Sequence, residues 1–264
     1  GLIAAVQAAA EGMDPSKILI LAPGEELAAD MTEMAPYVNA ADTDEQFQAN
    51  LTDDFEIYLS DIMTAGNNTN NSDMAAYVSE NSEEAKDWLT DTLGMEYGDL
   101  TQEAGSSVAR SFPAKEGNLN ELAQEALLKK VEELKIPVEY KAELKSVAYN
   151  EEGALDRITV TVDGKDQEID CLALVATDVS LIPVFEESQV YEADGKAAAL
   201  VVSNNAEQLN KDSGELINGL YAAGPILSAA VDGEGVLSGN ELTEAVMFGS
   251  TAGTEAAVYV SDNQ

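Results

Sequence analysis

The stretch GLYAAGPIL, at Gly219–Leu227, is the part of the sequence that best indicates the fold. Its apolar run ends in two alanines and a glycine, a pattern that predicts a buried strand running into a close backbone turn. The next residue is Pro225, where a ligand site of this kind usually carries a charged or hydrogen-bonding residue. Proline has no N–H donor and no polar side chain, so the rest of the chain must show whether a ligand site survives.

Two other apolar runs extend this pattern. KILILA (Lys17–Ala22) and CLALVA (Cys171–Ala176) are apolar on both faces, which is typical of parallel strands covered by helices. We therefore expect them to share one sheet with Gly219–Ala223. Helical patterns separate these strands and cover about residues 1–12, 44–65, 72–79, 82–93, 118–135 and 240–259. The alternation predicts an α/β fold with a doubly wound, mostly parallel sheet.

The segment 144–170 interrupts the alternation. Its two stretches of alternating apolar residues, with turns at Gly153 and at Asp163–Gly164, predict an inserted antiparallel β-meander. Near the C-terminus, SGNE (Ser238–Glu241) fits a capping box at the start of the last helix. We interpret residues 1–264 as a single domain.

The charge of the chain limits its partners. Lys and Arg together number 13 and Asp and Glu 50, so the formal net charge is −37. Such a surface repels nucleic acid and anionic lipid headgroups, and we exclude both as partners. It would attract cations or basic proteins. The acidity is typical of a salt-adapted or secreted bacterial protein, so we expect an extracellular or cell-surface location, with a cytoplasmic one as the alternative.

Residue types that commonly act in catalysis or bind metals are scarce. The chain has no histidine, which removes the usual general base near neutral pH and the commonest metal ligand. Its one cysteine, Cys171, lies in an apolar run and is interpreted as a buried structural thiol. We therefore expect no metal site, no internal disulfide and no membrane-spanning run. No signal peptide is recognisable, and because the chain begins inside a predicted helix we expect that its natural N-terminus has been removed.

Four segments, in this order, resemble a known family. They are GLIAAVQAAAEG (1–12), ENSEEAKDWLTDTLGMEYGDLTQEAGSSVARSF (80–112), VVSNNAEQLNKDSGELINGLYAAG (201–224) and LSGNELTEAVMFGSTAGTEAA (237–257). They are similar to the flavin domain of the fumarate reductase/succinate dehydrogenase flavoprotein family, especially its flavocytochrome c and urocanate reductase branch. The resemblance implies a Rossmann-like FAD/NAD(P)-binding fold that carries FAD.

The resemblance also names candidate cofactor-binding residues, which apply only if a flavin binds. Gly1 would be the last glycine of the dinucleotide fingerprint, whose first strand and first two glycines are absent from this sequence. The turn before the last helix would present its positive dipole end to a flavin carbonyl. The candidates are Gly1, Gly224, Ser238, Gly239 and Asn240.

The sequence departs from the family at several flavin contacts. Ala22 stands where the family has a glutamate for the adenosine ribose, and Glu25 or Glu26 could replace it only with a different loop path. Asp178 stands at a glycine position, and Pro225 where an acidic residue binds the ribityl chain. In the loop expected beside the flavin, glycines are lost and Asp30 and Glu33 add negative charge near a phosphate-bearing ligand.

The substrate machinery departs as well. Arg110 is retained, but Phe112 stands where the family has a histidine and Val236 where it has the proton-donating arginine. An aliphatic side chain cannot deliver a proton. Only the segment 179–218 stands where the family inserts its clamp domain, so the substrate chamber would lack a wall.

Two main functional interpretations stay open. The first is a degenerate relative that binds no cofactor, has no catalytic residues and serves as a structural or binding module for a protein partner or a neighbouring domain. The alternative is an FAD-dependent oxidoreductase with altered cofactor contacts. A further interpretation is a different small molecule or a cation in the vacated flavin cleft.

Overall fold

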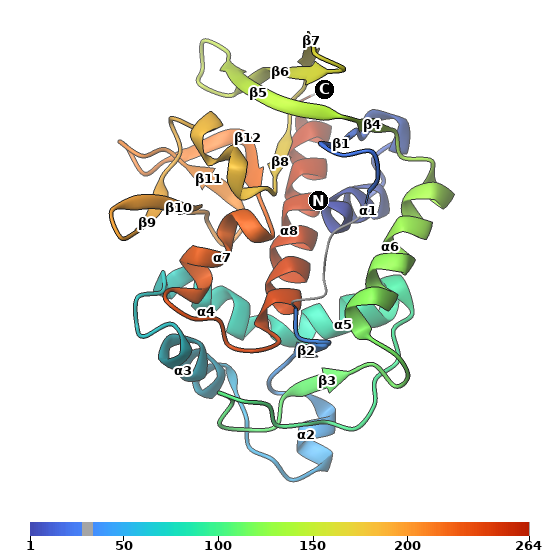
Figure 1. Ribbon diagram of the computed structural model, residues 1–264, viewed down its shortest axis with the longest axis vertical. Helices are drawn as coiled ribbons and strands as arrows, with labels where there is room; N and C mark the ends of the chain where they lie inside the picture. The colour runs from blue at the N-terminus through green and yellow to red at the C-terminus, as the bar shows by residue number, and fades with distance from the viewer. Residues whose placement is uncertain (28–33, 264) are drawn as a thin grey trace. The chain divides into compact units, whose positions relative to one another are not determined.

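The computed structural model describes residues 1–27 and 34–263, with the side chain of Ala197 left out (Figure 1). The chain forms two compact units. Unit 1 comprises Gly1–Ala28, Leu127–Leu227 and Phe248–Gln264, and unit 2 comprises Ala29–Ala126 and Ser228–Met247. The reading of 1–264 as a single domain stays a prediction.

Short parallel strand pairs form the centre of unit 1. Strand β1 (Ile20–Ala22) pairs in parallel with β4 (Val138–Tyr140). Strand β8 (Leu174–Ala176) pairs in parallel with β12 (Leu216–Ala222), whose other side pairs antiparallel with β11 (Glu207–Leu209). A separate hairpin of β9 (Val190–Ala193) and β10 (Lys196–Leu200) follows the 3₁₀ helix η2 (Val179–Val184).

The predicted meander is present in unit 1. Strands β5 (Ala142–Tyr149), β6 (Leu155–Val162) and β7 (Lys165–Asp170) form one antiparallel sheet. The turn between β6 and β7 has positive φ at both Asp163 and Gly164, which is the hairpin geometry that the sequence Asp-Gly predicts.

Helices α1 (Leu2–Ala10) and α8 (Asn240–Asp262) pack through small residues in unit 1. Gln7 Nε2 donates a hydrogen bond to Thr254 Oγ1 over 3.1 Å. A Cβ atom added to Gly253 would collide with the carbonyl oxygen of Ala4, and one added to Gly249 would lie 2.9 Å from Cγ2 of Ile3. Glycine at these positions therefore allows the two helices to approach closely.

This packing yields a prediction. We expect Gly253→Ala to lower the free energy of unfolding by about 1–3 kcal/mol, because the added methyl group meets backbone that cannot move without separating the helices. Gly249→Ala is the matched control and costs less, since its methyl group meets a side chain and alanine favours the helix. Urea unfolding of both variants measures the difference. Equal costs would contradict the close approach at Gly253.

Unit 2 is mostly helical. It contains α2 (Asp44–Gln48), α3 (Phe55–Ala65), α4 (Ser72–Glu80), α5 (Ser82–Leu93) and an antiparallel pair of β2 (Tyr37–Asn39) and β3 (Ser111–Pro113). Helices α6 (Leu119–Leu134), α7 (Pro225–Asp232) and α8 each contribute residues to both units. The side chains of Thr43 and Gln46 form a capping box that starts α2.

The α/β class predicted from the sequence is confirmed, but the strands form several small sheets. The expectation that Lys17–Ala22 shares a sheet with Gly219–Ala223 is wrong, since β1 pairs with β4 while β8 pairs with β12. Strand β1 is also shorter than predicted, because Pro15–Lys17 forms a 3₁₀ turn that Asp14 caps. The single helical pattern over 44–65 is two helices, α2 and α3.

Candidate functional site

The predicted residues of unit 1 meet at the end of β8. The N–H of Ile226 donates to the carbonyl oxygen of Thr177 over 3.2 Å, which holds the turn after β12 against the end of β8. Gly1 lies beside the same residue, since a Cβ there would be 3.6 Å from Thr177 Cγ2. Gly224 has a φ of +72°, a conformation that favours glycine. Thr177 thus neighbours both Gly1 and the turn that contains Gly224.

Two residues that replace expected flavin contacts start helices instead. Asp178 accepts a hydrogen bond from Ser180 N over 2.8 Å and caps η2. Pro225 is the first residue of α7, where its fixed φ and missing N–H cost nothing. Sequence reasoning missed α7, although proline before ILSAAVD is a start signal for a helix.

Glu25, one of the two acidic residues proposed to replace Ala22, forms an ion pair elsewhere, and the two acidic residues of the loop predicted beside the flavin are not described. Ala22 ends β1 and is buried. The carboxylate of Glu25 pairs with Lys141 Nζ at 2.9 Å, and Lys141 N also donates to Gly24 O. Asp30 and Glu33 lie outside the described residues.

The turn that precedes α8 belongs to unit 2 and is covered by β2. Tyr37 Oη and Ser238 Oγ are hydrogen-bonded at 2.5 Å, and Asn39 Nδ2 donates to Ser238 O at 2.9 Å. A Cβ added to Gly239 would collide with the ring of Tyr37. Gly239 N donates to Glu241 Oε2 over 3.2 Å. The capping box predicted between Ser238 and Glu241 is therefore wrong, because Tyr37 takes the serine hydroxyl and Glu241 reaches Gly239.

A buried chain of polar contacts runs from this turn to Arg110 within unit 2. Tyr58 Oη donates to Asn240 Oδ1 over 2.5 Å, and the Tyr58 ring lies 4.5 Å from the guanidinium carbon of Arg110. Burial raises the pKa of Tyr58, so this phenol stays protonated. Arg110 and Asn240 are therefore brought together through one tyrosine.

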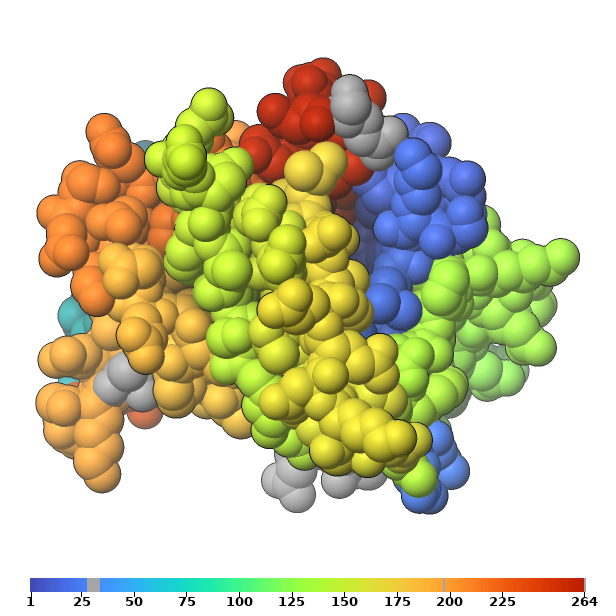
Figure 2. Space-filling model, turned by 90° about the horizontal axis from the view of Figure 1, so that it is seen from above, coloured from blue at the N-terminus to red at the C-terminus, as the bar shows by residue number. Residues whose placement is uncertain are grey.

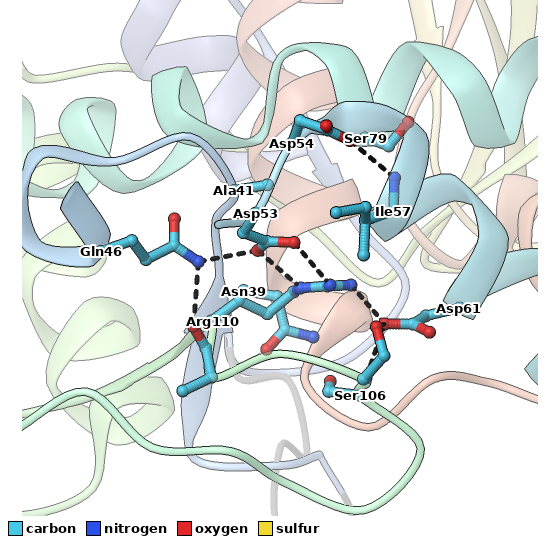
Figure 3. A network of polar contacts seen from close by, with 12 residues as sticks. Asn39, Ala41, Gln46, Asp53, Asp54, Ile57, Asp61, Ser79, Ser106 and Arg110 are labelled. Carbon is cyan, nitrogen blue, oxygen red and sulfur yellow. Dashed lines mark hydrogen bonds and ion pairs between the residues drawn. The ribbon is translucent and has the colours of Figure 1, made fainter. Parts of the chain in front are cut away.

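Arg110 is completely buried between two carboxylates (Figure 3). Its Nε and Nη2 donate to Asp53 at 3.0 and 2.8 Å, and its Nη1 lies 2.8 Å from Asp61 Oδ2. Gln46 Nε2 donates to Asp53 Oδ2 over 2.7 Å. Burial raises the pKa of Asp53, and the arginine and Gln46 oppose that rise. Every strong contact of the guanidinium is thus made with the protein itself.

Two carboxyl groups near Asn240, those of Asp232 and Glu244, are paired and buried. Asn240 Nδ2 donates to Glu244 Oε1 over 2.5 Å, and the Glu244 and Asp232 side chains share a hydrogen bond. Burial raises the pKa of Asp232 to about 6. Burial and then the charge of Asp232 raise the pKa of Glu244 well above its usual range. Because two like charges in one dry site repel, the pair holds a proton near neutral pH.

The positions that the resemblance assigns to substrate chemistry serve other purposes. Phe112 is buried and meets Tyr97 edge to face at 5.9 Å, with Lys86 Nζ 5.0 Å from its ring. Val236 is 46% exposed and contributes no polar group. Cys171, which was predicted to be buried, is only partly buried, and this burial raises its pKa to about 11.

Unit 1 also contains a large cavity of about 1070 Å³. Its lining includes Gly1, Thr177 and Asp178, together with consecutive residues of Lys17–Leu21 and Cys171–Ala176. Figure 2 shows a hollow between the blue residues of α1 and β1 and the yellow residues that lead into β8. Two of the predicted contact positions therefore line one cavity.

The predicted site residues are divided between the two units. Gly1 and Gly224 belong to unit 1, and Ser238, Gly239 and Asn240 belong to unit 2, so their role as cofactor contacts stays a prediction. Sequence reasoning missed Tyr37, Tyr58 and the buried acids. One signal was present: Glu244 follows Asn240 by one helical turn and stands directly before the apolar run 245–248 of α8. Over residues 1–27 and 34–263, no group of His, Cys, Asp and Glu could hold a metal, and no helix is long and apolar enough to cross a membrane.

The fold is that of flavin-dependent oxidoreductases. Over 98% of this chain and 76% of the other, it superposes on a flavocytochrome c3 fumarate reductase in its open conformation, with a TM-score of 0.78 and 14% identity. A 3-ketosteroid Δ4-(5α)-dehydrogenase from Rhodococcus jostii RHA1 gives a TM-score of 0.75 at 13% identity, with 97% of this chain and 94% of the other covered. A quinol-fumarate reductase gives 0.73 at 12% identity, with 100% and 70% covered.

One curated relative agrees with these structures. NADH:fumarate oxidoreductase from Klebsiella pneumoniae (strain 342) is 29% identical over 118 residues, which is 45% of this chain and 12% of that protein. The chain thus matches about an eighth of the relative's length. No family model matches the chain. The predicted resemblance to fumarate reductase-type flavoproteins is confirmed.

Proposed function

We propose that this protein is a cofactor-free relative of the fumarate reductase-type flavoproteins that serves as a structural or binding module. One observation carries the proposal: the positions where FAD contacts are expected are engaged in the protein's own structure. Asp178 caps η2, Pro225 starts α7, and the Ser238–Gly239 turn is covered by Tyr37. The residues present do not fit the cofactor.

The turn before α8 illustrates the misfit most clearly. A flavin carbonyl would need free N–H groups at the start of the helix. Gly239 N instead donates to the carboxylate of Glu241, and the Tyr37 ring occupies the space beside Gly239. A flavin would have to displace both side chains and break the Tyr37–Ser238 hydrogen bond. Each of these changes opposes binding.

A specific observation favours the alternative, an FAD-dependent oxidoreductase with altered contacts. The cavity of unit 1 is lined in part by Gly1 and Asp178, and its volume of about 1070 Å³ is slightly above the usual range of ligand pockets, about 300–1,000 Å³. Another small molecule could use the same space. Ala22 itself offers no carboxylate for a ribose. The acidic residues that line the cavity, among them Glu143, Asp156 and Asp170, come from other segments.

A protein partner or a neighbouring domain suits the proposal. Solved structures with this fold include the Sdh1 complex of Mycobacterium smegmatis, with a TM-score of 0.69. The net charge of −37 favours a partner with a basic surface and an extracellular or cell-surface setting.

The proposal is tested by titrating FAD into the purified chain while following flavin fluorescence and visible absorbance. We expect a colourless protein and no uptake at micromolar FAD. Two lost charged contacts, at Ala22 and Pro225, cost about 1.5–3 kcal/mol each, which weakens binding by roughly two to four decades. Tyr37→Ala is the matched variant, since it opens the turn without restoring either carboxylate, and it too should bind no FAD. Stoichiometric uptake by the unchanged chain would favour the oxidoreductase instead.

A further inference from the structure

Phe47 is the most exposed large apolar side chain among the described residues. It belongs to α2 in unit 2 and is 82% exposed. The neighbouring residue, Gln46, is buried and donates hydrogen bonds to Asp53 and to the carbonyl oxygen of Ala109 (Figure 3). Gln46 therefore anchors the inner side of α2 while Phe47 extends into solvent. Aromatic side chains are enriched at the centres of protein interfaces.

Both ends of α2 are fixed, so the Phe47 ring is presented on a rigid turn. Thr43 and Gln46 form the capping box at its start. At its end the N–H of Leu51 donates to the carbonyl oxygen of Gln46 over 3.0 Å. The N–H of Asn50 donates to that of Phe47 over 3.1 Å, and Asn50 has a φ of +55°, which completes a Schellman motif. A rigid backbone loses little entropy when a partner covers the ring.

Four carboxylates surround the start of α2. Asp44 precedes Phe47 by three residues, so both lie on one face of the helix. Asp42 comes just before α2, and Glu83 and Asp87 belong to α5. Burial and then the charge of Asp87 raise the pKa of Glu83, and the charges of the two acids at α2 add to this rise, so the four groups lie near one another. We call Phe47 and these four carboxylates the Phe47 surface.

No lysine or arginine in the described part of unit 2 is free to neutralise this surface. Unit 2 contains 25 of the 50 Asp and Glu residues but three of the 13 Lys and Arg residues. All three are paired within the unit: Lys86 with Glu45, Arg110 with Asp53 and Asp61, and Lys115 with Glu96. The Lys86 side chain is 9% exposed, and its ammonium lies 5.0 Å from the centre of the Phe112 ring. A further cation must therefore come from a partner.

We propose that the Phe47 surface docks a basic amphipathic segment of a partner protein, whose lysines or arginines meet the four carboxylates while an apolar side chain covers the Phe47 ring. A second copy of the chain fits poorly, because it brings the same formal charge of −37, and anionic lipid is repelled in the same way. The inference rests on the proposed role as a binding module, since it requires a partner, and it uses none of the flavin positions.

The apolar part of the surface is tested with a fluorescein-labelled peptide that carries lysine and leucine at helical spacing. A matched peptide has serine at every leucine position and the same charge. Fluorescence anisotropy is measured at about 150 mM salt, where distant charges are screened. We expect the leucine peptide to bind about tenfold more tightly than the serine peptide, and Phe47→Ser to remove this advantage without changing the binding of the serine peptide.

Val258→Ser is the matched control for Phe47→Ser. Val258 is 47% exposed on the part of α8 that belongs to unit 1, and Glu255 and Asp262 lie about one helical turn away on either side. It is thus another exposed apolar residue with acidic neighbours, and its replacement should keep the preference for the leucine peptide. An unchanged chain without that preference, or equal effects of the two substitutions, would overturn the proposal.

The carboxylates are tested separately. Asp44→Asn combined with Asp87→Asn should weaken both peptides about fivefold, since two charges of the surface are lost. Glu192→Gln combined with Asp194→Asn removes the same charge from exposed positions of the β9–β10 hairpin and should have little effect. Equal weakening by the two pairs would show that the peptides respond to total charge alone, which would contradict a defined surface.

Two further measurements distinguish other occupants. Sedimentation of the unchanged chain and of Phe47→Ser shows whether copies associate, and flotation with phosphatidylcholine vesicles shows whether Phe47 binds a membrane. We expect neither, and a dimer or vesicle binding that depends on Phe47 would overturn the proposal. FAD is absent from all of these experiments, so a failure of the Phe47 surface and a failure of the cofactor-free state are recognised independently.

Discussion

We expect Arg110→Met to lower the free energy of unfolding by about 3–5 kcal/mol, because it leaves Asp53 and Asp61 facing each other without the cation between them. The Arg110 and Asp53 side chains are fully buried, and the arginine makes two hydrogen bonds to Asp53 and an ion pair with Asp61. Methionine keeps much of the volume over the Tyr58 ring but supplies no charge. Urea unfolding near neutral pH measures the loss.

Lys115→Met is the matched control for this prediction. Lys115 forms an ion pair with Glu96 at the same N–O distance of 2.8 Å, but both side chains are exposed. Exposed pairs contribute about 0–1 kcal/mol, so this change should hardly affect unfolding. The triple variant with Asp53→Asn and Asp61→Asn should recover part of the loss, since no unpaired charge is then buried. Equal costs for Arg110→Met and Lys115→Met would show that the buried network is not held as described.

The buried pair Asp232–Glu244 should make the protein less stable as pH rises. Both pKa values are raised in the folded state, so above about pH 4 the unfolded chain has released protons that the folded chain still binds. The free energy of unfolding then falls with increasing pH through the folded pKa of about 6 of Asp232 and beyond, towards that of Glu244. The rise from 3.8 to about 6 for Asp232 corresponds to a loss on the order of 3 kcal/mol.

The double variant Asp232→Asn with Glu244→Gln isolates this effect. Between about pH 4 and pH 8 we expect the free energy of unfolding of this variant to fall by about 3 kcal/mol less than that of the unchanged chain. The repulsion among the other acidic groups affects both proteins alike, so it drops out of the difference between their two curves of unfolding free energy against pH. Glu56→Gln, at an exposed position on α3, is the control and should leave the slope unchanged. Parallel curves for the double variant and the unchanged chain would contradict a shared proton in this pair.

Local patterns predicted the elements whose signals lie within a few residues. The limits of α5 and the meander agree with the sequence because apolar periodicity and the Asp163–Gly164 turn act locally. The separation of β1 from β8 was not predictable, since the pairing of each strand depends on segments far away in the sequence. Ala22, Asp178 and Pro225 led to the prediction that flavin contacts are lost, and in the structure Asp178 caps η2 and Pro225 begins α7.

Contacts between distant residues could not be predicted. Arg110 was noted for its resemblance to a substrate residue, but its partners Asp53 and Asp61 lie more than 40 residues away in sequence. Tyr37 covers the turn at Ser238 through a contact between residues separated by 201 positions. Such pairs follow from tertiary packing, which no local pattern specifies.

The most direct test of a cofactor-free fold is an FAD titration of the unchanged chain. Calorimetry and flavin fluorescence are read together. We predict no saturable binding, because Asp178, Pro225 and Tyr37 occupy the contact positions. One FAD bound per chain with a Kd of about 1 μM or lower, a binding free energy of about −8 kcal/mol, would contradict the account.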